Sequence, residues 1–262
     1  MRADVLLKEA ETRYLRALDT QALGREMRIF DEVDSTNAYL LSLGAEAENL
    51  CCAALRQSAG RGRLGRSWAS GGGGLYFSFC VKAETPDLLL LLPLAAACAV
   101  LDAFREAGIE GAGVKWPNDI LIEEKKLVGI LCQSRGAYAV AGIGVNIAQS
   151  EADFASAGLP NAASLAMFGH TPDRWTLCAR IVTHAERRIA LLREGKTDAL
   201  LSDYRANCVS LGRRLIAVKA DGEIRGVGAD VDEKGRLVLE TEDGRIAVDS
   251  GEVKLRGEHG YV

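Results

Sequence analysis

The stretch SAGRGRLGRSW, residues 58–68, decides how the first half of the chain is organised. Gly60, Gly62 and Gly65 have the spacing of a dinucleotide-binding turn, which needs a strand before the glycines and a helix that opens on the last of them. An apolar run of strand length precedes the loop, but RSWASGGGG follows Gly65, and a helix does not continue cheaply through four glycines. Residues 75–81 then alternate as an aromatic strand. The order is strand, loop, strand, which disfavours a dinucleotide fold.

Two interpretations of this loop remain open. A solvated surface loop accounts for its glycines and arginines, but it leaves Trp68 unexplained, because indole is a costly group to expose on a mobile segment. Alternatively, backbone N–H groups and the guanidinium forks of Arg61, Arg63 and Arg66 bind a phosphate-containing anion. Trp68 then covers the ligand as the loop closes. We favour this anion-binding loop.

The composition bounds the class of protein. The chain has 262 residues, enough for one large domain or a large domain with a small one. Its 48% hydrophobic and 26% charged residues are ordinary for a globular protein with a real core. The formal net charge is −4, whereas proteins that bind nucleic acid are usually basic. The arginine-rich loop is therefore a local feature on an acidic background.

Targeting and redox features predict a cytoplasmic protein. The N-terminus carries acidic residues and no long apolar run, which is not the pattern of a signal peptide. The most apolar segment, 88–101, is shorter than a bilayer span and contains Pro93, so it predicts a buried helix. Seven cysteines without a C-x-x-C pair predict small buried side chains in a reducing compartment. Three histidines without ligand spacing disfavour zinc or a His-based triad.

The periodicity predicts an α+β fold. Helices are expected at 5–23, 35–44, from the apolar segment to about 107, at 173–192 and at 197–206. Strands are expected at 27–33, 50–56, 75–81 and in three short runs between 113 and 147. The end of the chain alternates between polar and apolar residues and is divided by D-G, K-G and D-G turns, which predicts a small antiparallel β-barrel.

A second motif, VKWPNDILIEEKKLVGIL at 114–131, carries candidate reactive groups. Asp119 and Lys126 are seven residues apart, and a hairpin around 123–125 would return them toward each other. A carboxylate and an ammonium so arranged suit Mg²⁺–nucleotide chemistry. An edge hairpin with exposed charges has the same pattern, and alternation leaves Lys125 open as the inward lysine.

Taken in order, the motifs resemble those of the biotin–protein ligases. They are STN at 35–37, RQSAGRGRLGRSW at 56–68, LYFSF at 75–79, KWPND at 115–119, KKLVGIL at 125–131 and GIGVNI at 142–147. Their order and approximate spacing match that family from about residue 24 to the C-terminus. The resemblance implies a mixed β-sheet packed with helices, like that of class II synthetases, over residues 1–208, with an N-terminal helix in 1–24. A small SH3-like β-barrel over 209–262 would follow.

The resemblance also implies an activity. The enzyme would join biotin to the α-phosphate of ATP with Mg²⁺, giving biotinyl-5′-AMP and pyrophosphate. It would then pass biotin to a lysine of a biotin carboxyl carrier protein, the carrier domain of a biotin-dependent carboxylase. Arginine and lysine suit this step, since two anions must approach each other. A closing loop suits it too, because the mixed anhydride hydrolyses readily.

Residue roles carry over by position. Lys126, Arg63 and Asp119 would be catalytic, and Asp119 would hold Mg²⁺; this resolves the choice of lysine in favour of Lys126. The biotin site would comprise Ser35, Thr36, Asn37, Gln57, Gly60, Arg61, Gly62, Arg63, Lys126 and Gly129. The nucleotide site would comprise Arg63, Arg66, Trp68, Asn118, Asn146 and Arg256.

The expected partners depend on one difference between this sequence and the bifunctional members of the family, and on two rival functions. Only about 25 residues precede the matching region, too few for the DNA-binding domain of bifunctional members, so a monofunctional ligase without DNA or membrane contacts is expected. The oligomeric state stays open, and a homodimer is compatible with the family. A lipoate- or octanoate-type protein ligase is the rival within the class, and a nucleic-acid module using the arginine loop is the rival outside it.

Overall fold

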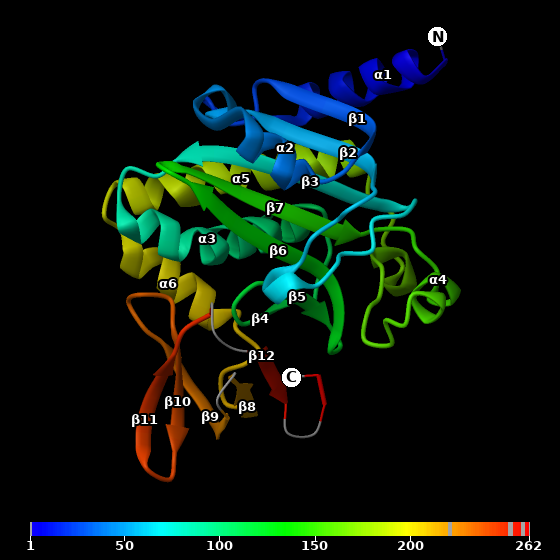
Figure 1. Ribbon diagram of the computed structural model, residues 1–262. Coiled ribbons are helices and arrows are strands. Elements are labelled where there is room, and N and C mark those ends of the chain that lie inside the picture. The colour runs from blue at the N-terminus through cyan, green and yellow to red at the C-terminus, as the bar shows by residue number, and fades with distance from the viewer. Residues whose placement is uncertain (1, 220–221, 251–253, 258–259, 262) are drawn as a thin grey trace.

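Two β-sheets organise the chain, and the larger one carries most of the helices (Figure 1). The computed structural model describes residues 2–219, 222–250, 254–257 and 260–261. The strand order is β1-β2-β3-β7-β6-β5-β4 in the seven-stranded sheet and β11-β10-β9-β8-β12 in the five-stranded sheet. The α+β class predicted from the sequence, a mixed sheet with helices followed by a small antiparallel β domain, is confirmed.

The larger sheet is mixed because its first two strands are parallel. Strand β1 pairs in parallel with β2, and every other neighbouring pair is antiparallel. The strands are β1 (Met27–Val33), β2 (Cys51–Gln57), β3 (Gly74–Lys82), β4 (Gly113–Lys115), β5 (Asp119–Ile122), β6 (Lys125–Arg135) and β7 (Tyr138–Asn146). Strands β3 and β7 are buried almost throughout, because helices or loops cover both faces at the centre of the sheet.

Helices cover the two faces unequally (Figure 1). Helices α3 (Pro86–Glu106), α5 (Arg174–Arg193) and α6 (Thr197–Ala206) lie on one face, and the short α2 (Thr36–Leu43) lies on the other. Thr85 and Asp173 cap α3 and α5 by accepting hydrogen bonds from backbone N–H groups. The face that carries α2 is the thinner one, and it leaves room for a cavity.

The apolar segment at 88–101 lies within the helix that the sequence predicts to end near residue 107. Helix α3 has 21 residues with Pro93 inside it, so it extends beyond the apolar segment at both ends. By length and composition alone, this helix would suffice for a membrane span. Within the fold, 72% of its most apolar window is buried. The predicted buried helix is therefore present: Leu88, Leu91, Leu92, Leu94 and Leu101 are buried, whereas Leu89 and Leu90 are exposed.

The first helix ends earlier than its periodicity predicts. Helix α1 (Arg2–Ala17) stops before residues 18–23, which the pattern assigned to it. Side chains of α5 bind the backbone there instead: Thr183 Oγ1 accepts from the N–H of Asp19, and Glu186 accepts from three further N–H groups. Tertiary hydrogen bonds have replaced the intrahelical ones.

Several short elements were not expected from the sequence. Helix α4 (Glu151–Ser156) starts with a capping box in which Ser150 and Asp153 bind each other's backbone N–H groups. Three 3₁₀ turns also occur: η1 (Gly44–Ala47), η2 (Arg63–Gly65) and η3 (Leu165–Phe168). Of these, η2 lies inside the glycine-rich loop and shapes the site.

The five-stranded sheet forms the small C-terminal β domain. Its strands are β8 (Arg214–Val218), β9 (Glu223–Val231), β10 (Leu237–Thr241), β11 (Gly244–Val248) and β12 (Lys254–Gly257). The expected D-G turn at 221–222 lies partly outside the described residues. Trp116 Nε1 donates to the carbonyl of Gly235 at 2.9 Å, which joins this sheet to the larger one. The predicted boundary between residues 208 and 209 falls in the link from α6 to β8 and remains a prediction.

The cysteines behave as the sequence predicts. All seven are free; six are buried and Cys132 is half-buried. Burial raises the pKa of the Cys51 thiol to about 12 and that of Cys52 to the same range. These thiols are packing groups with little thiolate character.

Candidate active site

A cavity of about 820 Å³ crosses the α2 face of the larger sheet, from β2 to β4. It collects all but two of the side chains predicted for the site: Ser35, Thr36, Asn37, Gln57, Arg61, Gly62, Arg63, Arg66, Trp68, Asn118, Asp119, Lys126, Gly129 and Arg256. Gly60 and Asn146 are outside its lining. Segments spread over more than two hundred residues of sequence therefore meet at one place.

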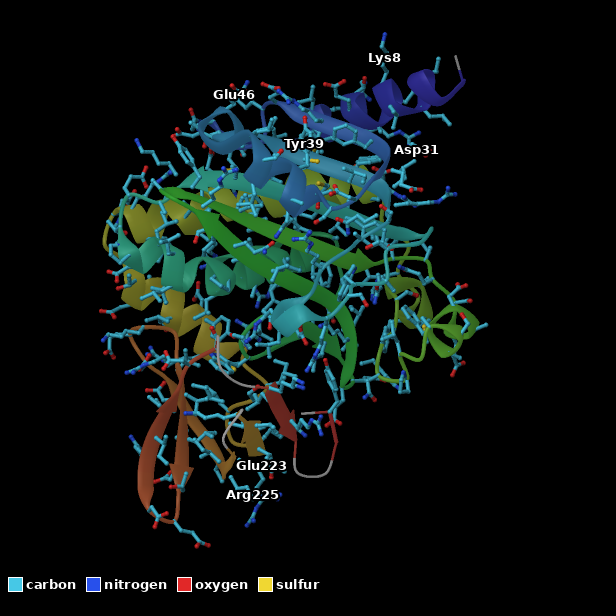
Figure 2. All side chains as sticks on the ribbon, in the orientation of Figure 1. Lys8, Asp31, Tyr39, Glu46, Glu223 and Arg225 are labelled. Carbon is cyan, nitrogen blue, oxygen red and sulfur yellow. The ribbon has the colours of Figure 1, made fainter. Side chains whose placement is uncertain are left out.

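Helix α2 supplies the first polar end of the cavity. Ser35 caps this helix, and its Oγ accepts from the N–H of Ala38 at 3.4 Å. Tyr39, labelled in Figure 2, anchors the helix over β1. Its hydroxyl accepts from Arg28 at 2.7 Å, and its ring meets that of Phe30 edge-on. The anchored helix directs Thr36 and Asn37, both buried, toward the sheet.

Those two side chains belong to a buried hydrogen-bond network. Gln57 Oε1 accepts from the N–H of Thr36 at 2.9 Å. Asn37 Nδ2 donates to Gln133 Oε1 at 3.0 Å and to the Leu131 carbonyl at 3.1 Å. Ser78 Oγ lies 2.7 Å from both Thr36 Oγ1 and Asn37 Oδ1. The network leaves a rigid polar wall of donors and acceptors.

Sequence reasoning missed Ser78 and Gln133. Ser78 is fully buried on β3, within the LYFSF motif, and Gln133 lies on β6. A hydroxyl inside an otherwise apolar strand was the available signal, since a buried polar group needs a partner. Nothing local distinguishes Gln133, whose partner is 96 residues away in sequence.

Three glycines form the floor between the two ends of the cavity. Gly129 on β6 is paired with Gly144 on β7. A Cβ on Gly129 would lie 2.5 Å from the Trp68 ring, and one on Gly144 would lie 2.4 Å from Trp68 Nε1. A Cβ on Gly142 would lie 2.0 Å from Asn37 Oδ1. Absence of side chains here lets Trp68 and Asn37 approach the sheet closely.

The glycine-rich loop folds over this floor as a strand-to-strand connection. The N–H of Trp68 donates to the Gly60 carbonyl, and that of Gly62 donates to the Arg66 carbonyl. Gly60 is therefore a structural residue at the base of the loop. Within η2, Leu64 adopts φ 55° and ψ 41°, a left-handed conformation uncommon for leucine. The absence of a helix after Gly65, predicted from the sequence, is confirmed.

At the centre of the cavity, Lys126 Nζ lies 2.6 Å from Asp119 Oδ1. The predicted hairpin produces this approach, with Glu123 and Glu124 at the turn in left-handed conformations. Lys125 instead directs its ammonium outward to the carbonyl of Pro160. Lys126 is thus the inward lysine, and it also lies 5.2 Å from the centre of the Trp68 ring.

Arg63 ties the loop to two other parts of the chain. Its guanidinium donates to Asn118 Oδ1 at 2.9 Å and to the carbonyl of Ser250. Asn118 in turn donates to the Ile130 carbonyl at 2.6 Å. Burial lowers the pKa of Arg63, and nearby Asp119 partly opposes that shift. An anion in the cavity would compensate this partly desolvated charge.

Asn146 supports Lys126 from below the cavity. Its buried Nδ2 lies 3.1 Å from the Ala163 carbonyl and 3.4 Å from the Lys126 carbonyl. The N–H of Lys126 donates to the carbonyl of Asn161, and that of Ala163 to the carbonyl of Lys126. This geometry makes Asn146 a positioning residue here, and its nucleotide contact remains a prediction.

The end of the cavity near β4 is strongly cationic. Among the described residues, seven cations and a single carboxylate, Asp119, line the cavity as a whole; the cations are Arg61, Arg63, Arg66, Lys115, Lys126, Lys254 and Arg256. Lys115 and Tyr261 are lining residues that sequence reasoning did not select. Such an excess of positive charge suits a polyanionic ligand.

The described residues hold no group of three or more His, Cys, Asp or Glu side chains able to enclose a metal ion. Asp119 is the one carboxylate of the described cavity lining. Its Oδ1 is buried and, despite the proximity of Lys126, accepts no hydrogen bond of good geometry within the described chain. A single carboxylate fits Mg²⁺ that is bound mainly by substrate phosphates and water.

Known proteins share both sheets of this fold. The model of the biotin/lipoate A/B protein ligase family matches residues 29–149, and that of the biotin protein ligase C terminal domain matches 210–256. The chain is 32% identical to the biotin–[acetyl-CoA-carboxylase] ligase of Mycobacterium tuberculosis, over 91% of this chain and 94% of that protein. It is also 32% identical to the bifunctional ligase/repressor BirA of Bacillus subtilis, over 95% of this chain and 79% of that protein.

A solved structure agrees with both matches. The biotin protein ligase from Aquifex aeolicus in complex with biotin and ATP has a TM-score of 0.80 and 30% identity, and covers 89% of this chain and all of that one. The chain belongs to the biotin/lipoate A/B protein ligase family. Its relatives named above are biotin ligases, and the resemblance drawn from the sequence is confirmed.

Proposed function

We propose that this protein is a biotin–protein ligase that works in two steps within the one cavity. In the first step, a carboxylate oxygen of biotin attacks the α-phosphorus of ATP, and pyrophosphate leaves. In the second step, a lysine amine of the acceptor attacks the carbonyl carbon of biotinyl-5′-AMP, which forms an amide and releases AMP and a proton. The observation that carries this proposal is a cavity with a neutral polar end and a cationic end that meet at Lys126.

The neutral end suits biotin. A ureido ring carries fixed donors and acceptors, which the rigid side chains of Thr36, Asn37 and Gln57 match. The glycine floor at Gly129 and Gly144 would admit the aliphatic tail once Trp68 moves off it. The biotin carboxylate would then reach Lys126, whose charge offsets repulsion from the nucleotide.

The cationic end suits the triphosphate. Arg63, Arg66 and Arg256 would bind phosphate oxygens, with Asn118 holding Arg63 in place. Asp119 would hold Mg²⁺, which supplies positive charge to the phosphates when bound. Trp68 would cover the nucleotide side of the site, and closure of the loop would keep water from the mixed anhydride.

Three finer assignments belong to the same proposal. The acceptor is a biotin carboxyl carrier protein, in keeping with the name of the Mycobacterium tuberculosis relative. The enzyme acts in the cytoplasm, where buried free thiols persist. It needs no DNA for catalysis.

Transfer of radiolabelled biotin to a purified biotin carboxyl carrier domain tests the function. The label should appear on the carrier only with ATP, and an excess of lipoate or octanoate should not compete. The dithiolane ring of lipoate has no ureido donors for the polar end, so a site selective for biotin should not use lipoate. Transfer of labelled lipoate with comparable efficiency would therefore favour the lipoate-type rival. Absence of transfer with either acid would contradict the proposal.

A further inference from the structure

Lys115 at the end of β4 is a buried lysine that the scheme above does not use. Its side chain lines the cavity, yet the residue is only 5% exposed. Lysines are almost never buried to this degree unless they are paired. Lys115 lies directly across from Asp119 in the β4–β5 register.

The contacts of Lys115 come from the end of the chain. Its ammonium donates to the carbonyl of Tyr261 and lies 3.5 Å from the centre of the Tyr261 ring. In the part of the chain that the structure describes, no carboxylate lies within ion-pair distance of this ammonium. A neutral carbonyl and a ring face compensate a buried charge less well than an anion does.

The electrostatics agree with this picture. Burial lowers the pKa of Lys115 to about 8, Asp119 partly opposes the shift, and neighbouring cations add to it. Those cations are Lys126, Arg66 and Arg256. Within the described residues, Asp119 therefore compensates the charge of Lys115 only in part.

Tyr261 also contacts Asp119, the residue proposed to hold Mg²⁺. Its hydroxyl donates to Asp119 Oδ2 at 3.0 Å. The same residue therefore engages Asp119 through its hydroxyl and Lys115 through its carbonyl and ring. It bridges the two groups from within the cationic end of the cavity, where it also lines the wall.

We propose that Lys115 binds the terminal phosphates of ATP and then the pyrophosphate formed from them, and that Tyr261 holds Lys115 and Asp119 until the nucleotide displaces it. This inference rests on the proposed function. As the bond from biotin oxygen to the α-phosphorus forms, the bond from that phosphorus to the bridging oxygen breaks. The electron pair leaves with pyrophosphate, and the Lys115 charge offsets that developing negative charge.

Calorimetry with sodium pyrophosphate as the probe tests Lys115 on the full chain, without biotin or turnover. Lys115→Met should weaken pyrophosphate binding at least tenfold, and Lys115→Arg should restore most of it. Lys125→Met is the matched control, since it removes a lysine charge of the same sheet that points outward. Biotin affinity and thermal unfolding of the Lys115 variants should stay near those of the unmodified chain. Pyrophosphate binding within twofold in Lys115→Met, or an equal loss in Lys125→Met, would overturn the assignment.

Tyr261→Ala tests the displacement at a residue that lies outside the strands. Without its ring and hydroxyl, pyrophosphate should bind at least threefold more tightly, and the KM for ATP should fall in parallel. Unchanged or weaker binding would overturn the idea that Tyr261 occupies the phosphate site. Pyrophosphate binding is measured apart from biotin transfer, so loss of transfer with intact pyrophosphate binding would contradict the proposed function alone.

Discussion

The Nζ atom of Lys126 lies 2.6 Å from Oδ1 of Asp119, between the neutral and the cationic ends of one cavity. Both groups are mostly buried, with 23% and 14% of their side-chain surfaces exposed. In this setting a charge pair is sensitive to any third charged group, because little water screens it. A carboxylate and a phosphate entering from opposite ends would therefore meet at Lys126.

Lys126→Ala should abolish the formation of biotinyl-5′-AMP. The reacting carboxylate and phosphate would lose the charge that offsets their repulsion, so the rate should fall by at least about a hundredfold, as when one electrostatic group is removed from other active sites. Biotin-dependent release of pyrophosphate measures this step. Lys125→Ala, which removes an outward charge, should retain near-normal release. Near-normal release from Lys126→Ala would contradict the role.

Arg63→Gly should let biotinyl-5′-AMP escape from the enzyme. The guanidinium links the loop to Asn118 and to Ser250, so its loss should loosen loop closure. Free adenylate in solution should rise relative to biotin transferred to the carrier domain, and chromatography of the reaction mixture measures both. Arg56→Gly, an exposed arginine on β2 outside the cavity lining, serves as control. An unchanged ratio in Arg63→Gly would show that this contact does not retain the intermediate.

Gly142→Ala should weaken biotin binding at least tenfold, a loss of about 1.4 kcal/mol. The new methyl group would lie 2.0 Å from Asn37 Oδ1, so the amide must move out of its network. Calorimetric titration with biotin measures the loss, and ATP binding should change little. Gly72→Ala is the matched control, because no atom lies within 4 Å of the added carbon. Equal affinities in the two variants would exclude a role for the Asn37 orientation.

Arg256→Ala should raise the KM for ATP severalfold and leave the biotin affinity unchanged. Arg256 reaches the cationic end of the cavity from β12, so its removal affects phosphates and not the polar end. Arg225→Ala removes a charge from β9 of the same small sheet, where it is paired with Glu223 away from the cavity (Figure 2). If both variants kept the ATP kinetics of the parent chain, the small sheet would be a passive appendage.

Glu186→Gln should destabilise the fold near pH 7 by roughly 1–3 kcal/mol, the range for a charged hydrogen-bond partner. Burial raises the pKa of Glu186, but hydrogen bonds from the N–H groups of Leu23, Ala22 and Gln21 outweigh it, so the pKa is lowered. The carboxylate therefore contributes stability above its unfolded pKa of about 4.3, and this contribution is lost as the pH falls through the lower folded value.

Urea unfolding at pH 7 and in acid checks the direction of this pH dependence of stability. The difference between Glu186→Gln and the parent chain should be full at pH 7 and should shrink steadily below about pH 4. Glu9→Gln, an exposed change on α1, should stay within about 0.5 kcal/mol at every pH. A difference that persists in acid would mean that Glu186 acts through packing and not through charge.

Local sequence predicted the central elements well, because their signals are short-range. Ser35 before a helix, the alternation of LYFSF and the turn before Lys126 each act within a few residues, and each element is present. Helix α1 was predicted too long because Thr183 and Glu186, some 165 residues away, bind the N–H groups of residues 19 and 21–23, which follow its end. Periodicity carries no information on such distant partners.

By itself, the sequence determined the class of fold, the strand–loop–strand form of the glycine-rich segment and all but two of its own candidate site residues as lining of one cavity. Only the tertiary structure decided which of these side chains meet. It placed Lys126 beside Asp119, made Gly60 and Asn146 supporting residues, and brought Ser78, Gln133, Lys115 and Tyr261 to the site. The physical reason is that a motif specifies local backbone geometry, whereas burial, charge compensation and hydrogen bonding across the sheet depend on all the strands at once.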